Sequence, residues 1–237
     1  GVGFWPMAQQ YRHIIPGNPD GLVCNHNMFY IKPLACSEIE AVALQASLNS
    51  TITGLVKHFY GRYAGTEGAL KTEVCDTVLL EIPSPKSASP ELAHRMQAAL
   101  NSMASRKVTH LVQESMLQCR DETHMREILE RPVELANELR QPDRRALDDA
   151  VFEMIGVEDP KERSHLIDEL YEQTASYYRQ QRTLEIQGMR NRSKAGRKQM
   201  SPRDLAASVW DSLKPEERGE PVMEWIKSRW PGGIEVS

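Results

Sequence analysis

Four side chains between positions 57 and 72 could contact phosphates or base edges, because each of them can donate hydrogen bonds. They are Lys57, Arg62, Lys71 and Thr72. Glycines at positions 61, 65 and 68 would let the intervening backbone approach a surface closely. The stretch has no carboxylate pair, no nucleophile beside a base and no metal-ligand spacing, so it predicts binding rather than catalysis. An ordinary glycine-rich connection with surface lysines is the alternative.

A second group of cations follows residue 189, where the sequence QGMRNRSKAGRKQMSPR contains no acidic residue. Such a run is typical of a flexible arm or of a contact with phosphate, and the alternative is a solvated linker. The candidate DNA contacts in it are Arg190, Arg192, Lys194, Arg197 and Lys198.

The four cysteines do not indicate a metal site. They lie at positions 24, 36, 75 and 119, which is not the paired spacing of a zinc site. Cys24 and His26 could supply two ligands, but the sequence nearby offers no further pair. We therefore expect reduced thiols in a cytoplasmic protein, with no metal.

The charge of the chain is divided into blocks. The formal net charge of the 237 residues is −4. Residues 1–120 carry 10 basic and 9 acidic side chains, residues 121–185 carry 9 and 17, and residues 186–237 carry 10 and 7. The acidic middle block could face a protein partner, whereas the basic blocks suit DNA.

The composition is that of a globular protein, with 40% apolar and 26% charged residues. The sequence has no apolar run of about 18 residues, so it predicts no membrane-spanning segment. Its first residues, GVGFWPMAQQ, do not have the pattern of a secretory signal. Because Gly1 stands in place of a starting Met, we expect this edge to be a cut within a longer protein.

The first part of the chain reads as a small mixed α/β module over residues 1–88. A strand or hairpin is expected in GLVCNHNMFYIKP, with a polar turn inside it. Ser37 and Glu40 form a capping-box pattern, which predicts a helix over 37–48 and a second over 50–59. The apolar run TVLLEIP predicts a short buried strand that ends at Pro83 and Pro85.

The rest of the chain reads as a larger, all-α module. Helices are expected in SPELAHRMQAALNSM, in KVTHLVQESMLQC, from Asp143 to Gly156, and in a long segment that starts at Pro160 after a capping Asp159. The fold class is thus α+β. The expected divisions are 1–88, a helical module over 89–189, a basic linker over 190–200 and a helical pair over 201–237.

The order of these features resembles the target-recognition region of N6-adenine DNA methyltransferases from single-chain and type I restriction-modification systems. The residues that carry the resemblance are ALQASLNSTITGLVKHFYGRYAGTEGALKTEVCDTVLLEIPSP, a helix followed by a glycine-rich basic turn and an apolar segment. The stretch RRALDDAVFEMIGVEDPKERSHLIDELYEQTASYYRQQRTLEIQ is similar to the helical segment that follows in larger members. Together the two cover roughly residues 20 to 190.

The resemblance also implies what this chain lacks. In that family an Asn/Asp-Pro-Pro-aromatic motif holds the flipped adenine, and a glycine loop binds S-adenosylmethionine. The nearest strings here, NPDG at Asn18 and WPGG at Trp230, do not match. We therefore expect no cofactor in this chain, with S-adenosylmethionine bound by a catalytic domain N-terminal to it.

Three hypotheses follow. The first is a DNA-recognition and scaffold fragment, inactive alone, of a bacterial site-specific DNA (adenine-N6) methyltransferase or restriction-modification enzyme. Its partners would be double-stranded DNA, the catalytic methyltransferase domain and a nuclease or translocase, with no membrane. The second is a non-catalytic helical adaptor that binds a protein. The third is the specificity subunit of a multi-subunit restriction system, which usually has two recognition modules where this chain has one.

Overall fold

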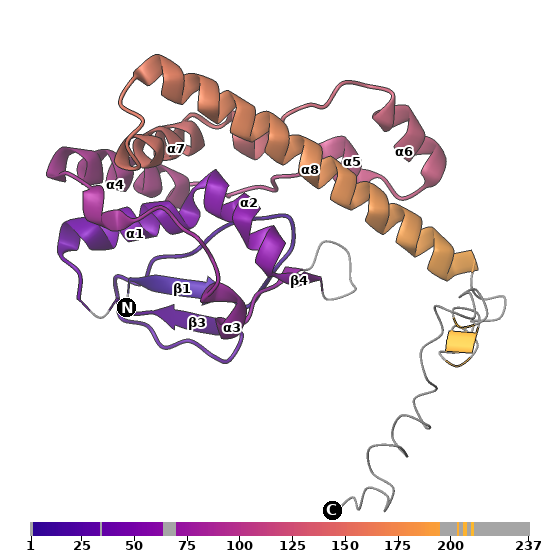
Figure 1. Ribbon diagram of the computed structural model, residues 1–237, viewed down its shortest axis with the longest axis horizontal. Coiled ribbons are helices and arrows are strands. Elements are labelled where there is room, and N and C mark those ends of the chain that lie inside the picture. Colours follow the sequence, from indigo (N-terminus) through magenta and orange to yellow (C-terminus); the bar gives the residue numbers. More distant parts are fainter. Residues whose placement is uncertain are drawn as a thin grey trace, which may run out of the picture. The chain divides into compact units, whose positions relative to one another are not determined.

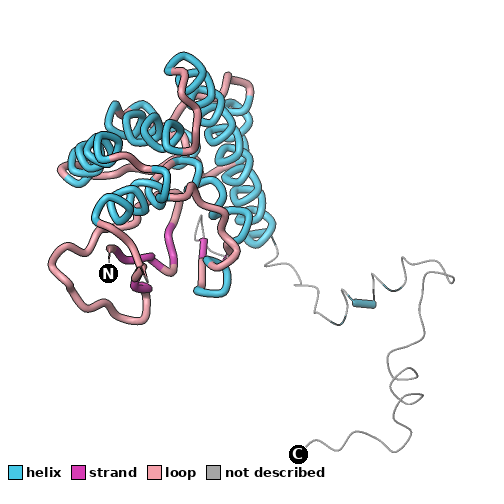
Figure 2. Tube along the Cα trace, turned by 60° about the vertical axis from the view of Figure 1, so that its left-hand side comes forward, coloured by secondary structure: helices cyan, strands magenta, loops and turns pink. Residues whose placement is uncertain are grey.

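The computed structural model describes residues 2–33, 35–63 and 70–194, together with residues 203, 206, 207 and 210. The chain divides into a compact unit from Gly1 to Arg190 and a second unit from Asn191 to Ser237. The first unit has the α+β fold that the sequence predicts, with short antiparallel strands beside α-helices (Figures 1 and 2). The helical pair expected over 201–237 lies almost wholly outside the described residues.

The strands form two small antiparallel sheets. Strand β1 (Gly3–Pro6) pairs with β3 (Met28–Ile31). The other sheet has the order β2-β5-β4, made of β2 (Ala8–Gln9), β5 (Leu70–Lys71) and β4 (Arg62–Tyr63). The strand expected near Met28 is confirmed, but its partner is β1 from the N-terminus, which the sequence analysis did not predict.

The first two helices begin where local caps predict. Helix α1 (Glu38–Asn49) has the complete capping box, because the Glu40 amide donates to Ser37 Oγ at 3.2 Å and the Ser37 amide donates to Glu40 Oε2 at 2.7 Å. Helix α2 (Thr51–Tyr60) follows at once, with Ser50 as its N-cap. Both helices confirm the prediction.

The apolar run after residue 76 is not a buried strand, so that prediction is wrong. Residues Val74–Thr77 form the short helix α3, and the chain then runs without regular structure to the 3₁₀ turn η1 (Pro85–Ser87). Val78 is 77% exposed and Leu79 is 61% exposed. The spacing of residues in a continuous apolar run does not distinguish a strand from a helical turn. Here the Glu73–Asp76 capping box begins a helical turn just before the run.

Helices from both predicted modules share one core. Helix α4 (Pro90–Ala104) packs against α7 (Pro142–Met154) and against α1. Buried members of this core include Ala43, Ala46, Leu92, Met96, Met103, Leu147 and Val151. The boundary expected near residue 88 therefore does not separate two compact units.

Two details of the helical part differ from expectation. Residues 107–113 have no regular secondary structure where a helix was expected, and α5 covers only Glu114–Gln118. Their backbone has tertiary partners instead, because the Leu111 amide donates to the carbonyl of Tyr11 at 2.7 Å. Helix α7 begins at Pro142 with Gln141 as N-cap, so Asp143 is not the cap that the sequence predicts. Its expected end at Gly156 is confirmed, since that glycine has a φ of 102°.

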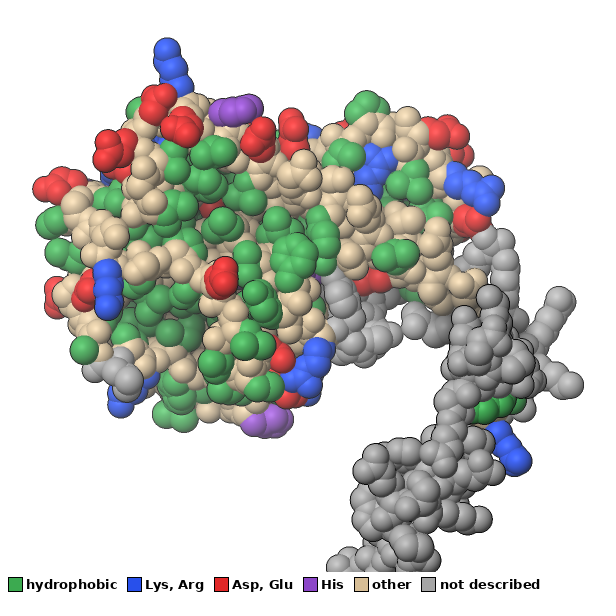
Figure 3. Space-filling model, viewed as in Figure 1, with side chains coloured by type: hydrophobic (Ala, Val, Ile, Leu, Met, Phe, Trp, Pro, Cys, Tyr) green, Lys and Arg blue, Asp and Glu red, His purple; other side chains and the backbone are tan. Residues whose placement is uncertain are grey.

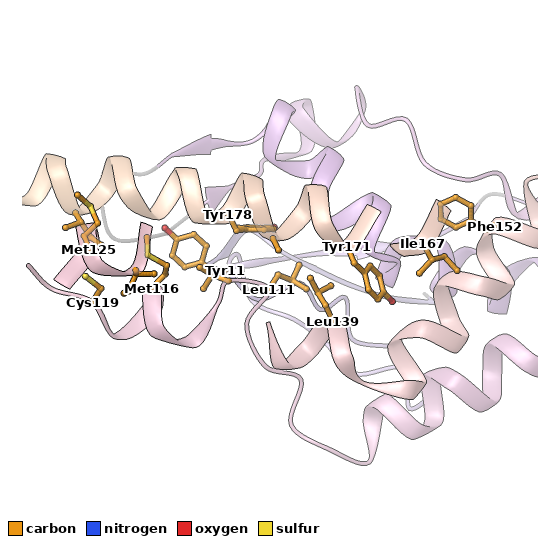
Figure 4. Close-up of a cluster of buried hydrophobic side chains, with 14 residues drawn as sticks. Tyr11, Leu111, Met116, Cys119, Met125, Leu139, Phe152, Ile167, Tyr171 and Tyr178 are labelled. Carbon is orange, nitrogen blue, oxygen red and sulfur yellow. The ribbon is translucent and has the colours of Figure 1, made fainter. Parts of the chain in front are cut away.

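The longest helix, α8 (Pro160–Lys194), covers the second core. Its buried face packs on α5, on α6 (Glu122–Leu129) and on the 3₁₀ turn η2 (Asn137–Arg140). Figure 4 shows these side chains in a row along α8. They include Tyr11, Leu111, Met116, Met125, Leu139, Ile167, Tyr171 and Tyr178. The helix extends four residues past Arg190, into the segment that we expected to be a linker.

Candidate nucleic-acid interface

Strands β4 and β5 form an antiparallel hairpin on either side of residues 64–69, two of which are glycines. Arg62 on β4 lies directly opposite Lys71 on β5. Residues 64–69 themselves lie outside the described residues. In Figure 1, β4 lies directly beyond the end of α2. The paired strands therefore present two cationic side chains beside each other.

The hairpin is held against α2 by a close contact. Leu70 is 1% exposed, and it packs where Gly61 follows the end of α2. A Cβ atom on Gly61 would lie 2.8 Å from Leu70 Cδ1. Glycine is required here because of this approach, not because of an unusual backbone conformation.

The two exposed cations are paired with acidic neighbours. Arg62 Nη2 lies 2.8 Å from Glu73 Oε2 and 2.9 Å from Asp76 Oδ2, and Lys71 Nζ lies 2.7 Å from Glu73 Oε1. Hydrogen bonds from Lys71 and Arg62 lower the pKa of Glu73. The Glu73 amide and Arg62 likewise lower the pKa of Asp76. We call these four side chains the hairpin charge cluster, and its formal charge is zero at neutral pH.

Lys57 is not at the surface, which corrects its expected role as a phosphate contact. Its side chain is on the inner face of α2, and the residue is 2% exposed. Its Nζ lies 2.6 Å from Gln9 Oε1 and 3.2 Å from His13 Nδ1. Burial lowers its pKa to about 7. A side chain in this position cannot reach a bound duplex unless the sheet moves away from α2.

The remaining candidates have different surroundings. Thr72 is 2% exposed, and its amide donates to the carbonyl of Met7 at 2.8 Å, so its position is also interior. Arg190, Arg192 and Lys194 belong to the last turns of α8, but their side chains lie outside the described part of the chain. Arg197 and Lys198 lie wholly outside it. Of the described candidates, Arg62 and Lys71 are thus brought together at the surface.

Aromatic residues join the end of α2 to α8. The His58 ring meets the Tyr178 ring edge to face, with 4.7 Å between centroids. Phe59 and Tyr177 have centroids 5.8 Å apart. Burial, and then the charge of Lys57, lower the pKa of His58 to about 3. This cluster was not predicted from the sequence, although its four aromatic or imidazole side chains form two adjacent pairs, at positions 58 and 59 and at positions 177 and 178.

Two cavities lie elsewhere in the described residues. One of about 650 Å³ is formed by α8 and the segment after α6, and one of about 850 Å³ is formed by residues 14–19, α1 and α4. In the larger cavity the amides of Gln45 and Asn49 both donate to the carbonyl of Ile15. These two bonds hold the amides against the backbone of residue 15.

No helix in the described residues is both long enough and apolar enough to cross a membrane. Searches with this chain against protein-family models, curated proteins and solved structures found no match.

Proposed function

We propose that this chain is the DNA-recognition and scaffold part of a bacterial, cytoplasmic N6-adenine DNA methyltransferase or restriction-modification enzyme. The observation that carries the proposal is the β4–β5 hairpin, which sets Arg62 opposite Lys71. The sequence resemblance supplies the family, and the hairpin supplies the surface that would meet a duplex.

The chemistry of the hairpin suits phosphate contacts rather than base readout. Arg62 has 56% of its side chain exposed and Lys71 has 41%. A phosphate can accept hydrogen bonds from both, but it must compete with Glu73 and Asp76 for them. We therefore expect weak, salt-dependent binding with a dissociation constant of roughly 10⁻⁴ to 10⁻⁶ M.

An exposed apolar group beside the hairpin supports the scaffold part of the proposal. Phe59 at the end of α2 is 65% exposed, and Val74 on α3 is 55% exposed. Val78 and Leu79 continue this surface along the chain, and α3 packs on α2. Such a group suits contact with another protein surface, for which we propose the catalytic methyltransferase domain of the parent protein. That domain would bind S-adenosylmethionine, and a nuclease or translocase is a further candidate partner.

A helical adaptor without a DNA-binding role is the second candidate function. It is favoured by the burial of Lys57, which removes one of the cations that we expected to contact DNA. Figure 3 shows carboxylates gathered over α4, α7 and the start of α8, a face that would repel a duplex. The two candidates differ in whether the hairpin meets DNA.

The experiment makes the net charge of the hairpin charge cluster either more positive or more negative. Glu73→Gln with Asp76→Asn leaves Arg62 and Lys71 without their carboxylates, so it should tighten duplex binding several-fold at low salt. Arg62→Ala with Lys71→Ala should weaken binding for every sequence and lower the salt slope by about one for each phosphate that is no longer neutralised. Fluorescence anisotropy of a labelled duplex over a salt series measures both effects. Lys107→Ala removes an exposed lysine elsewhere and serves as the control.

The contrary outcome is that both double variants bind the duplex with the same affinity as the unaltered chain. In that case the hairpin is not a DNA interface, and the adaptor function is favoured. A separate assay with labelled S-adenosylmethionine should detect no methyl transfer by this chain alone. Transfer of the label to DNA would contradict the proposal that the chain is a recognition part without the catalytic centre.

A further inference from the structure

The amine of Lys57 is buried against neutral hydrogen-bond acceptors. Gln9 Oε1 and His13 Nδ1 are its two partners, at 2.6 Å and 3.2 Å. Among the described residues, no carboxylate forms an ion pair with this amine. A buried ammonium group normally has such a partner, because the transfer of an unpaired charge from water into a protein costs several kcal/mol. The site is therefore built for an uncharged amine.

The tautomer of His13 supports the same conclusion. Its Nε2 lies 2.8 Å from the carbonyl oxygen of Leu48, which can only accept, so Nε2 carries the hydrogen. Nδ1 is then an acceptor and receives a hydrogen from Lys57. A neutral amine has two N–H groups and here has two acceptors, so both are satisfied. A protonated amine would have a third N–H group to satisfy.

Other ionisable groups close to this site keep their state between pH 7.5 and 9.5. Burial, followed by the charges of Lys57 and Arg144, holds the pKa of His13 well below its usual range. Burial and Lys57 lower the pKa of His58 to about 3. Lys57 is thus the group of this set whose proton uptake can respond to pH near neutrality.

The amine connects α2 to the sheet that carries the hairpin. Gln9 belongs to β2 and lies opposite Leu70 on β5, the middle strand of the sheet. The bond from Lys57 to Gln9 therefore holds β2 to α2, and β2 in turn holds β5. Gln9 is fixed in turn by donation from its Nε2 to the carbonyl of Ile14. His13 packs closely on α2, since a Cβ on Gly54 would lie 2.9 Å from its ring.

We propose that Lys57 is a proton-sensitive tether, whose protonation releases β2 from α2 and opens its pairing with β5 while the helical core stays folded. In the released form the amine meets water and holds a proton up to its ordinary pKa of 10.5, whereas in the packed form it loses that proton above about pH 7. The released form therefore binds more protons between these two values. Its population should fall about tenfold for each pH unit between 7 and 10 and should be constant below 7.

Hydrogen exchange on the full chain tests the tether. The Thr72 amide, which donates to Met7, reports on the sheet, and the amides of α4 and α7 report on the core. Between pH 7.5 and 9.5 the protection factor of Thr72 should rise about tenfold per pH unit, while the core amides change much less. Lys57→Met should abolish this rise. Lys107→Met, which removes an exposed lysine elsewhere, should retain it.

Three results would overturn the proposal. The first is a Thr72 protection factor that does not depend on pH, and the second is a pH-dependent rise of that factor that persists in Lys57→Met. The third is an equal rise in the protection factors of the α4 and α7 amides, which would mean that the whole protein unfolds. If Lys57→Met does not fold, the Nζ chemical shift of the unaltered protein decides instead. Titration of Nζ near 7 supports the tether, and titration near 10.5 refutes it. These measurements contain no DNA, so they succeed or fail independently of the proposed DNA interface.

Discussion

Asp148 on α7 accepts two hydrogen bonds from Thr51, 97 residues earlier in the chain, at the first residue of α2. The Thr51 amide donates to Oδ1 at 2.8 Å and the Thr51 hydroxyl donates to Oδ2 at 2.6 Å. Tyr171 on α8 donates to Oδ2 as well, at 2.8 Å. One buried carboxylate thus satisfies the beginning of α2, and it joins the helix that supports the hairpin to the helical core.

Replacement of Asp148 by Ala should lower the free energy of unfolding by about 3 kcal/mol, because the Thr51 amide and the Tyr171 hydroxyl lose their acceptor in a buried site. Urea denaturation followed by circular dichroism measures the change. Asp149→Ala is the matched control, since that neighbour forms partly exposed ion pairs with Arg95 and Arg163. The expected loss there is about 1 kcal/mol or less. Equal losses in the two variants would contradict the buried-cap role.

Gly61→Ala should destabilise the protein by roughly 1–3 kcal/mol, because the added methyl group would lie 2.8 Å from Leu70 and must displace it. The displacement should be local to the hairpin, so the exchange of the Thr72 amide should accelerate more than that of the α7 amides.

Gly188→Ala provides the control for this substitution. Gly188 lies within α8, where an added Cβ meets no atom within 4 Å. Alanine there should stabilise the protein by up to about 1 kcal/mol through its better helix propensity. If Gly61→Ala is as well tolerated as Gly188→Ala in urea unfolding, the close packing between Gly61 and Leu70 is not required.

The buried carboxylate of Glu138 on η2 should make stability sensitive to acid. Its Oε1 accepts from Arg144 Nη2 at 3.1 Å, and its Oε2 accepts from Arg106 Nη1 at 2.8 Å. Burial acts to raise its pKa, but the hydrogen bond from Arg106 and the charge of Arg144 outweigh it, so the pKa lies below the ordinary 4.5. A lowered pKa in the folded state means that this stabilisation is complete above pH 4.5 and is lost as pH falls through the folded pKa.

Glu138→Gln should therefore cost about 3–5 kcal/mol at pH 7, because it leaves two guanidinium groups without their shared carboxylate. The difference from the unaltered protein should narrow as pH falls below 4.5. Unfolding free energies measured in urea from pH 3 to 7 follow this convergence, with the exposed Glu130→Gln as control. A difference that stays constant over the whole range would show that the ionised carboxylate is not what stabilises η2.

Much of the helical part could be predicted because its signals are local. Ser37 and Glu40 lie three residues apart and cap α1 by themselves, and Ser89 followed by Pro90 begins α4 in the same way. Such contacts depend on the conformation of a single turn, so neighbouring residues in the sequence are sufficient to indicate them. The α+β class follows from the same kind of pattern.

The candidate site depended on contacts between distant residues. The sequence shows that Lys57, Arg62 and Lys71 are basic, but contacts with Gln9 and His13 place the first in the interior. Glu73 and Asp76 neutralise the other two. The residues that contact these cations lie on other strands and helices. The local sequence around a lysine does not indicate whether its side of the helix will be buried by the rest of the chain.

Local sequence was enough to specify the helices that cap themselves and the fold class. Packing in three dimensions was needed to keep residues 107–113 from forming a helix and to leave Val78 and Leu79 exposed. The two sets of features differ in the range of the interactions that create them. Caps and helix propensity act within about one turn, whereas the Leu111 bond to Tyr11 and the burial of Lys57 exist only after segments far apart in the chain have packed together.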